Sequence, residues 1–283
     1  MSKQIILHQT ENGADSRQVV DVTPCGSLAF GTDGVPMIVT RSLLGKAYAY
    51  TKPTRLMYRE DFVLLPAATQ AAGKPYTFDL IGGASPAVAR DALGGILITT
   101  TGHTAADLAA VVGLTGTGFM PLPITTTSNL VFATTIRIPA LSAATTDHLV
   151  VAGFTEIGAT IDPTAEAGEG ALFMYDGGST AVVTTGLTDA QRANWILAHK
   201  VNGVDTFAAT SVPVAAAVDI NFIIEVGSDR KAKFYIDGVY VGTGPALTAA
   251  DTFTPLVGTQ VGVTHDAAST LTIREVIVDR AIA

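Results

Sequence analysis

The sequence predicts an all-β protein, a two-sheet antiparallel β-sandwich preceded by an N-terminal arm. Apolar and polar residues alternate within short runs along much of the chain, which is the pattern of half-buried strands. Turns rich in Gly, Asp and Pro separate these runs at short intervals. No helical pattern is long enough to build a second, helical domain, so the strands are expected to bury their apolar faces between two packed sheets.

The clearest strands lie in the segment 219–242. At its start every second residue is apolar, namely Ile220, Phe222, Ile224 and Val226. After a turn at 227–230 the period continues, with Ala232, Phe234 and Ile236 expected to face the core and Lys231, Lys233 and Tyr235 to face outward. Asp237-Gly238 tolerates the positive φ values of a tight hairpin. The segment therefore predicts three antiparallel strands.

Other strands are expected along the rest of the domain, over residues 75–81, 94–100, 130–138, 147–154 and 170–175. Near the C-terminus the apolar parity changes, with Leu271 and Ile273 on one face and Val276 and Val278 on the other. A β-bulge near Arg274-Glu275 would reconcile the two parities.

Three stretches carry short helical signals. Residues 85–94 begin with Ser-Pro and end with Gly, which predicts a helical turn. Thr188 and Gln191 have the spacing of a capping box, so 187–200 is expected to open with a helical turn before a strand at 195–201. The pattern at 103–112 fits either a helix or a strand.

The chain divides into an arm or small β appendage at residues 1–54 and a sandwich at residues 55–283. In the first part, polar links rich in Gly and Asp separate short apolar runs, and the segment 52–55 (KPTR) is a plausible joint. Such an arm can pack on a neighbouring molecule.

Composition excludes several classes of protein. Of the 283 residues, 48% are apolar and only 15% are charged, and the net charge of −8 argues against nucleic-acid binding, which needs clustered Lys and Arg. Cys25 is the single cysteine, so no internal disulfide or zinc cluster is expected. No run approaches the ~18 apolar residues of a transmembrane helix. We therefore expect no membrane partner. The first residues do not resemble a secretory signal, so the protein is expected to be made and used in a cytosol, or released by a route other than secretion.

Several segments together resemble concanavalin A-like lectin and glucanase sandwiches, which fold as jelly rolls. They are Arg59-Glu60-Asp61-Phe62, the strands at 94–100 and 130–138, and above all FIIEVGSDRKAKFYIDGVYVGTGPAL at 222–247. The layout of residues 55–283 is similar, more narrowly, to sandwich domains of tailed-bacteriophage head decoration (cement) and head fibre proteins. That resemblance implies a homotrimer bound to the major capsid protein, on a virion assembled in the host cytoplasm.

The glycosidases of this fold need paired carboxylates, and in the sandwich glucanases these stand on one strand as Glu-x-Asp-x-x-Glu or a close variant. The sequence contains no such pattern. Glu275 and Asp279 could share one face of the last strand, but Arg274 and Arg280 beside them favour an exposed, salt-bridged edge. No nucleophile elbow, phosphate loop or zinc-protease motif occurs. We therefore expect no enzyme activity and assign no catalytic residue.

No cofactor or metal site is assigned. Asp162, Glu166 and Glu169 form an acidic loop that could hold calcium or simply solvate a connection. Asp147-His148 is more typical of a surface pair at a strand start than of a metal or acid–base pair. The histidines at 103, 199 and 265 stand alone, which favours structural or solvated positions. Trp195 is expected in the core.

Two main functions remain. The first is a non-enzymatic virion structural protein, a capsid decoration or head-fibre subunit that stabilises the shell by binding its surface through the arm and the sandwich rim. The alternative is a carbohydrate-binding module for host attachment, with a glycan as partner. A glycosidase is a third and weaker hypothesis.

Overall fold

The fold is described from a computed structural model. It describes main chain and side chains for residues 59–62, 87–100, 109–110, 129–141, 148–156, 169–177, 184, 186–248, 253–261 and 269–279. For further strands, including every strand before residue 55, it describes the backbone alone. The chain forms two compact units, Met1–Arg55 and Leu56–Ala281.

The first unit consists of strands only, among its described residues. β1 (Lys3–Glu11) pairs antiparallel with β2 (Ala14–Val22). β3 (Gly26–Phe30), β4 (Pro36–Arg41) and β5 (Ala47–Tyr50) form a three-stranded antiparallel sheet.

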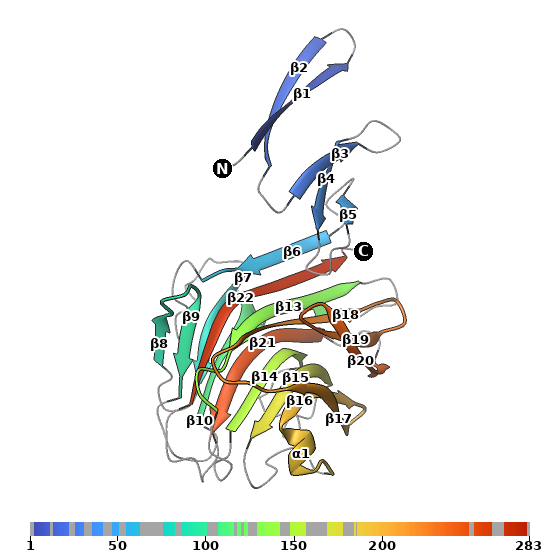
Figure 1. Cartoon of the computed structure of the whole chain (residues 1–283). Helices are drawn as coiled ribbons and strands as arrows, with labels where there is room; N and C mark the ends of the chain where they lie inside the picture. The colour runs from blue at the N-terminus through green and yellow to red at the C-terminus, as the bar shows by residue number, and fades with distance from the viewer. Residues whose placement is uncertain are drawn as a thin grey trace. The chain divides into compact units, whose positions relative to one another are not determined.

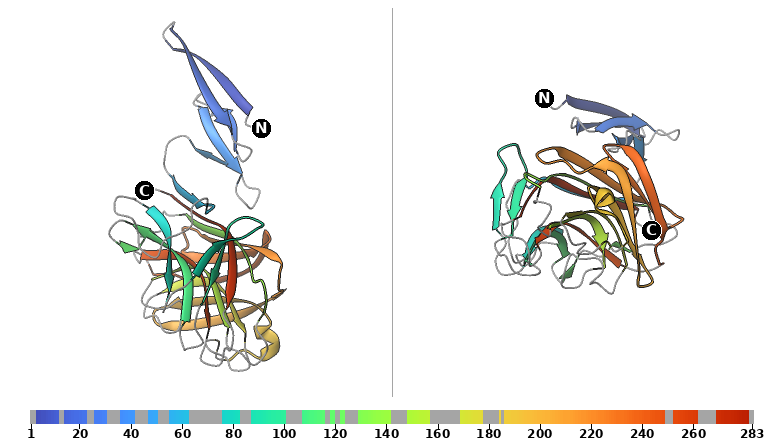
Figure 2. Two further views of the ribbon diagram at one scale, coloured as in Figure 1. Left: turned by 90° about the vertical axis from the view of Figure 1, so that its left-hand side faces the viewer. Right: turned by 60° about the horizontal axis from the view of Figure 1, so that its bottom comes forward.

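The second unit contains two antiparallel sheets (Figure 1). The nine-stranded sheet consists of β7 (Tyr76–Gly82), β10 (Asp107–Thr115), β11 (Gly118–Phe119), β12 (Leu122–Pro123), β14 (His148–Thr155), β15 (Gly170–Gly177), β16 (Asn194–Val201), β17 (Val204–Pro213) and β21 (Thr252–Val261). The eight-stranded sheet consists of β6 (Arg55–Glu60), β8 (Ala87–Arg90), β9 (Ile96–Thr99), β13 (Leu130–Arg137), β18 (Asp219–Val226), β19 (Lys231–Ile236), β20 (Val239–Ala246) and β22 (Thr270–Ala281). Figure 2 shows the sheets as two layers. The predicted two-sheet sandwich is confirmed.

The predicted meander is present as β18, β19 and β20. Alternate residues of β19 are buried, so Ala232, Phe234 and Ile236 face the core as expected. In the hairpin turn Asp237 has a φ of 49° and Gly238 a φ of 78°, the positive pair that a tight two-residue turn requires.

The predicted bulge lies at Arg274. Thr135 of β13 pairs with Glu275 of β22, whereas the next residue, Ile136, pairs with Ile273, so Arg274 is skipped. This extra residue lets Ile273 and Val276 both reach the core, where each has no exposed surface.

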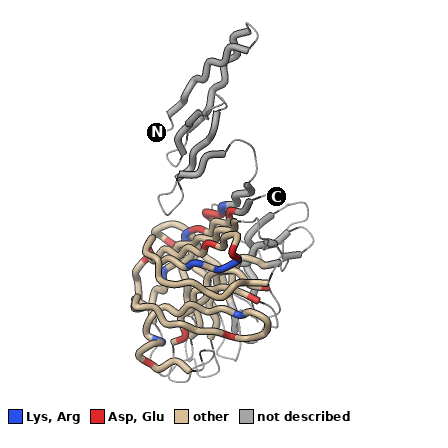
Figure 3. Tube along the Cα trace, turned by 90° about the vertical axis from the view of Figure 1, so that its right-hand side faces the viewer, with Lys and Arg blue, Asp and Glu red and all other residues tan. Residues whose placement is uncertain are grey.

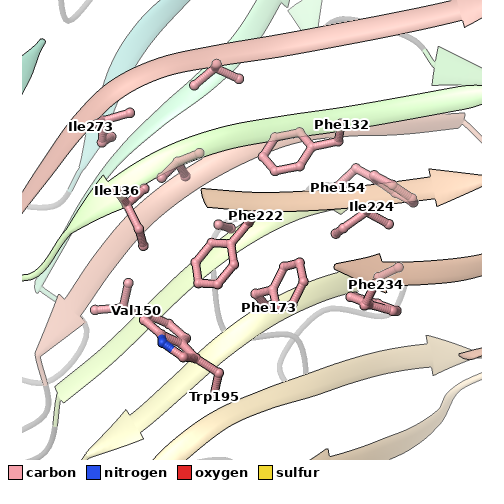
Figure 4. Packing of buried hydrophobic residues seen from close by; sticks show 14 of the residues in the cluster. Phe132, Ile136, Val150, Phe154, Phe173, Trp195, Phe222, Ile224, Phe234 and Ile273 are labelled. Carbon is pink, nitrogen blue, oxygen red and sulfur yellow. The ribbon is translucent and has the colours of Figure 1, made fainter. Parts of the chain in front are cut away.

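Aromatic side chains fill the space between the sheets (Figure 4). Phe173 of β15 stacks on Phe222 of β18 with ring centroids 4.2 Å apart. Trp195 of β16 packs edge-on against Phe222 at 4.7 Å, and its 2% exposure confirms it as a core residue. Truncating such a ring to Ala removes about 3–5 kcal/mol of stability.

A second apolar cluster is formed by side chains on the outer face of the nine-stranded sheet. Its buried members are Ala110, Leu149, Val151, Leu172, Met174, Ile196, Ala198 and Leu256. All eight residues of β14 and all eight of β15 are therefore buried. Strands buried on both faces carry nearly continuous apolar runs rather than alternation.

The helical expectations had mixed outcomes. The capping box is confirmed, because Thr188 caps the single turn α1 (Asp189–Arg192) and Gln191 bonds back to Thr188. The helical turn at 85–94 was wrong in part, because residues 87–90 form β8 and pair with β9. A short helical turn has few hydrogen bonds of its own, whereas the neighbouring strand β9 supplies partners to residues 87–90. Residues 107–112 belong to a strand, β10.

The remaining predicted strands are confirmed to within a residue or two as β7, β9, β13, β14 and β15. Within the residues that the structure describes, no helix has the length and apolar character to cross a membrane. Charged positions are sparse along the described trace (Figure 3), as the composition implies.

Candidate functional site

The outward face of β18, β19 and β20 brings two tyrosines together with polar side chains. Strand register aligns Glu225, Lys233 and Thr243 in one row across the three strands. The adjacent row contains Tyr235 opposite Tyr240. We call these five residues the tyrosine surface.

The two rings form an open, angled pair. Tyr235 and Tyr240 have centroids 5.7 Å apart and planes at 68°. Tyr240 is 55% exposed, the one aromatic among the large exposed hydrophobic residues of the described part. The Tyr235 hydroxyl donates to Glu225 Oε2 at 3.2 Å, and the Tyr240 and Thr243 hydroxyls lie 2.7 Å apart. These bonds orient both rings from their polar ends and leave a face of Tyr240 open.

Local sequence explains the arrangement. The Asp237-Gly238 turn places Tyr235 and Tyr240 opposite each other. Val241 is then an extra residue, because Phe234 pairs with Gly242 instead. This bulge moves Thr243, rather than a glycine, opposite Lys233, where its hydroxyl reaches the Tyr240 hydroxyl.

Glycines on the inner side of β20 let the strand approach the core closely. A Cβ on Gly242 would lie 2.5 Å from Leu197 Cδ1, and one on Gly244 would lie 2.5 Å from His199 Nε2. In β20 these glycines therefore point inward, whereas Tyr240 and Thr243 point outward. The tyrosine surface thus lies directly over tightly packed core residues.

A charged network lies elsewhere on the same sheet. The Asp91 carboxylate, in the β8–β9 turn, accepts bonds from Arg274 Nη1 (2.8 Å), Arg137 Nη2 (3.2 Å), the Thr272 hydroxyl (3.1 Å) and the Leu93 amide (2.8 Å). Burial raises the pKa of Asp91, but the bonds from Arg274, Leu93 and Thr272 outweigh it, so the pKa falls to about 2. With its acceptors filled, Asp91 has a structural role.

A buried Ser–His pair joins the two sheets. His148 Nε2 of β14 lies 2.5 Å from Ser269 Oγ, just before β22, and 3.0 Å from Thr259 Oγ1 of β21. His148 is 1% exposed and Ser269 4%. The pair resembles half of a nucleophilic triad, but its burial inside the sandwich leaves it a cross-link between sheets.

Comparisons with known proteins agree with the architecture. No protein-family model matches the chain, and no curated protein matches it. A protein of unknown function from Shewanella oneidensis MR-1 superposes with a TM-score of 0.53 and 12% identity, over 81% of this chain and 87% of that one. The likeness is one of fold alone, an all-β sandwich of two antiparallel sheets.

Two other solved structures are similar to the chain with lower TM-scores. The β-glucanase of Bacillus licheniformis matches with a TM-score of 0.48 and 11% identity, over 78% of this chain and 97% of that one. Peanut lectin matches with a TM-score of 0.47 and 11% identity, over 81% and 98%. At such identities the likeness concerns the fold alone. The comparisons give no support to the virion role, which stays a prediction from the sequence.

Glu275 and Asp279 do share the outer face of the eight-stranded sheet, where they oppose Thr135 and Val131 of β13. Glu275 is bound by Arg59 of β6 at 2.9 Å. The expected exposed edge was wrong, because β22 lies between β13 and β9 and Asp279 is only 8% exposed. The bulge directs Arg274 toward Asp91 and Asp219 rather than toward this pair. The side chain of Arg280 lies outside the described residues.

Glu169 is a structural carboxylate. Its Oε1 accepts from the Asn202 amide (2.9 Å) and the Thr248 hydroxyl (2.5 Å), and its Oε2 from the Thr248 amide (2.7 Å). The Glu169 amide in turn donates to Glu156. This carboxylate ties together three chain segments and is 6% exposed, so both oxygens are engaged by protein donors. Asp162 and Glu166 lie outside the described residues.

The two histidines whose side chains the structure describes, His148 and His199, are buried. The surface position expected for His148 was wrong, because the ring lies in the core against Tyr175. Burial lowers the pKa of His199 to about 4, and its ring packs on Phe234 at 4.8 Å. His103, His265, Asp147 and Cys25 fall outside the described residues. Within the described part, no three His, Cys, Asp or Glu side chains gather as metal ligands.

Sequence reasoning missed the tyrosine surface, although it placed Tyr235 on the outer face. The available signal was Tyr240, five residues after Tyr235 and on the other side of the Asp237-Gly238 turn. A tight turn makes such residues cross-strand neighbours.

Proposed function

We propose that this protein is a non-catalytic carbohydrate-binding module and that the tyrosine surface contacts the glycan. The observation that carries the proposal is the pair Tyr235 and Tyr240, held on one sheet face beside a carboxylate, an ammonium group and a hydroxyl. A sugar unit offers both an apolar face of C–H groups and a rim of hydroxyls, so it needs this mixture of partners.

The ring of Tyr240 supplies the apolar contact. Its electron-rich face attracts the weakly positive C–H groups of a pyranose, and its 55% exposure leaves room for a sugar to stack. The ring is oriented by the Thr243 hydroxyl and by Tyr235, so little side-chain entropy is lost on binding.

The flanking row supplies the polar contacts. Glu225 accepts hydrogen bonds from sugar hydroxyls, whereas Lys233 donates to them. The two side chains are cross-strand neighbours, so their charges offset each other. This balance favours neutral sugars over acidic ones.

Three of the described carboxylates favour a binding function over hydrolysis. Asp91 and Glu275 are each bound by an arginine side chain. Glu169 accepts hydrogen bonds from both the amide and the hydroxyl of Thr248. A glycosidase needs one carboxyl held protonated and a second placed opposite it across the scissile bond. These three groups are instead committed to the fold.

The test is binding to a panel of soluble and insoluble polysaccharides and oligosaccharides, with Tyr240→Ala beside the unmodified protein. We expect Tyr240→Ala to weaken binding about tenfold or more, which corresponds to about 1.4 kcal/mol. Tyr240→Phe keeps the ring and should retain most of the affinity. Val239→Ala alters the neighbouring residue, which is also exposed, and serves as the matched control.

Two results would overturn the proposal. One is the absence of binding to every glycan in the panel by the folded, unmodified protein. The other is equal affinity of Tyr240→Ala and the unmodified protein. Newly formed reducing ends in a bound polysaccharide would separately contradict the non-catalytic part.

A further inference from the structure

The ends of the two sheets differ in how they are protected. An edge strand presents unpaired backbone N–H and C=O groups, which form a template for another strand. β8 and β20 are the ends of the eight-stranded path, and β17 is an end of the nine-stranded path. Side chains are described for all three of these edges.

Two of the three edges carry features that block strand addition. β8 has only four residues and ends in Arg90. β20 contains two register shifts against β19 and also Pro245, which lacks an N–H. Short length, charge, bulges and proline are the usual means by which proteins prevent edge pairing.

β17 has fewer of these features, although its register against β16 shifts between Ala209 and Pro213. It runs for 10 residues, contains no Lys or Arg, and has proline only as its last residue, Pro213. Its pairing with β16 is continuous from Val204 to Ala209. Its single charge, Asp205, faces Lys200 at 3.7 Å. Among the described strands, β17 pairs with β16 alone (Figure 1).

The exposed side chains of β17 are small or β-branched. Val204 is 65% exposed, and Thr206 and Ala208 are also exposed. Such side chains favour strand pairing and offer little steric or charge resistance to it. An edge of this length and character is the surface expected to accept another strand.

We propose that β17 pairs antiparallel with β17 of a second copy of this chain, across a two-fold axis near Phe207. This pairing joins the two nine-stranded sheets edge to edge. The contact is isologous, which means that both copies use the same residues and each contact occurs twice, once on either side of the axis. The proposal is independent of glycan binding, and it implies a dimer rather than the trimer expected from the sequence resemblance.

The sequence of β17 is complementary to itself in this register. With Phe207 at the axis, Thr206 opposes Ala208 within the regular segment Val204–Ala209. Asp205 opposes Ala209, so the only charged residues of the two strands do not face each other. This self-complementarity is why a second copy, rather than an unrelated strand, is the proposed occupant.

The experiment measures the mass of the full chain by light scattering across a dilution series. We expect the unmodified protein to have twice the mass of one chain. The double variant Thr206→Lys/Ala208→Lys should lose the dimer, because it brings four ammonium groups together at the two-fold. Both positions are exposed, so the variant should keep its fold, which thermal unfolding by circular dichroism checks.

Val239→Lys introduces a charge at an exposed position of the other edge, β20, and should leave the dimer intact. A folded double variant that remains dimeric would overturn the proposal. So would an unmodified protein that is monomeric throughout the series, or a Val239→Lys variant that dissociates as the double variant does.

Discussion

The outer faces of the two sheets are built in opposite ways. On the nine-stranded sheet, Val151 and Met174 are buried on the side away from the core, and β14 and β15 have no exposed residue. On the eight-stranded sheet, β19 alternates buried residues with exposed or half-buried ones. Both faces of β14 and β15 are therefore buried, whereas only the inward face of β19 is.

This difference separates stability from binding. A face that is already covered contributes buried area and has no room for a ligand. Side chains on a solvent-exposed face can be substituted with little loss of stability. Such a face can therefore acquire the aromatic and polar groups of a binding surface. The tyrosine surface lies on the open face.

The sharpest test uses one substitution on both faces. Val151→Lys places a charge in the covered apolar cluster and should destabilise the fold by about 3–5 kcal/mol or prevent folding. Val131→Lys lies on the open face, between Asp279 and Glu225 of the flanking strands, and should change stability by less than about 1 kcal/mol. Urea unfolding measures both values. Equal losses would contradict the contrast between the faces.

A second test concerns the charges of the open face. Asp91→Asn should lower the free energy of unfolding at neutral pH by about 1–3 kcal/mol, since it weakens bonds to Arg274 and Arg137. The carboxyl has a pKa of about 2 in the folded protein, below its ordinary value of 3.8, so its contribution is complete above about pH 4. It decreases as the pH falls toward 2 and is lost below that.

The measurement is urea unfolding of the unmodified protein and Asp91→Asn from neutral pH down to about pH 2. The difference between the two should shrink in the acid range. A difference that stays constant from neutral pH to about pH 2 would show that the Asp91 charge does not stabilise the fold.

The smallest expected effect is that of Lys233→Ala. Lys233 lies opposite Glu225 on the open face, and exposed cross-strand charge pairs contribute only about 0.2–1 kcal/mol. Stability should therefore hardly change, whereas glycan affinity should fall because a donor is removed. A large loss of stability without a loss of affinity would assign Lys233 to the fold instead of the binding surface.

Much of the sandwich was predictable because its signals are local. Alternation through Phe222 and Phe234 identified two strands and their buried faces, and the Asp237-Gly238 pair identified the turn between them. The change of parity between Ile273 and Val276 located the bulge at Arg274. Each of these signals operates over a few residues, where backbone geometry translates directly into which side a residue faces.

The missed features depend on residues that are distant in sequence. His148 meets Ser269 across 121 positions, and Glu169 meets Thr248 across 79. β8 is a strand because β9 is beside it, not because of its own residues. Arg274 bonds to Asp91 because the bulge turns it toward the β8–β9 turn. No local pattern contains such partners.

The sequence by itself determined the fold class, the order of the main strands and the inward face of the meander, because strand period and turn chemistry are properties of neighbouring residues. The tertiary structure decided which outer face is covered, which edge is open and which polar groups meet. These depend on how the strands are ordered and registered within each sheet, and that arrangement follows from the packing of the whole core.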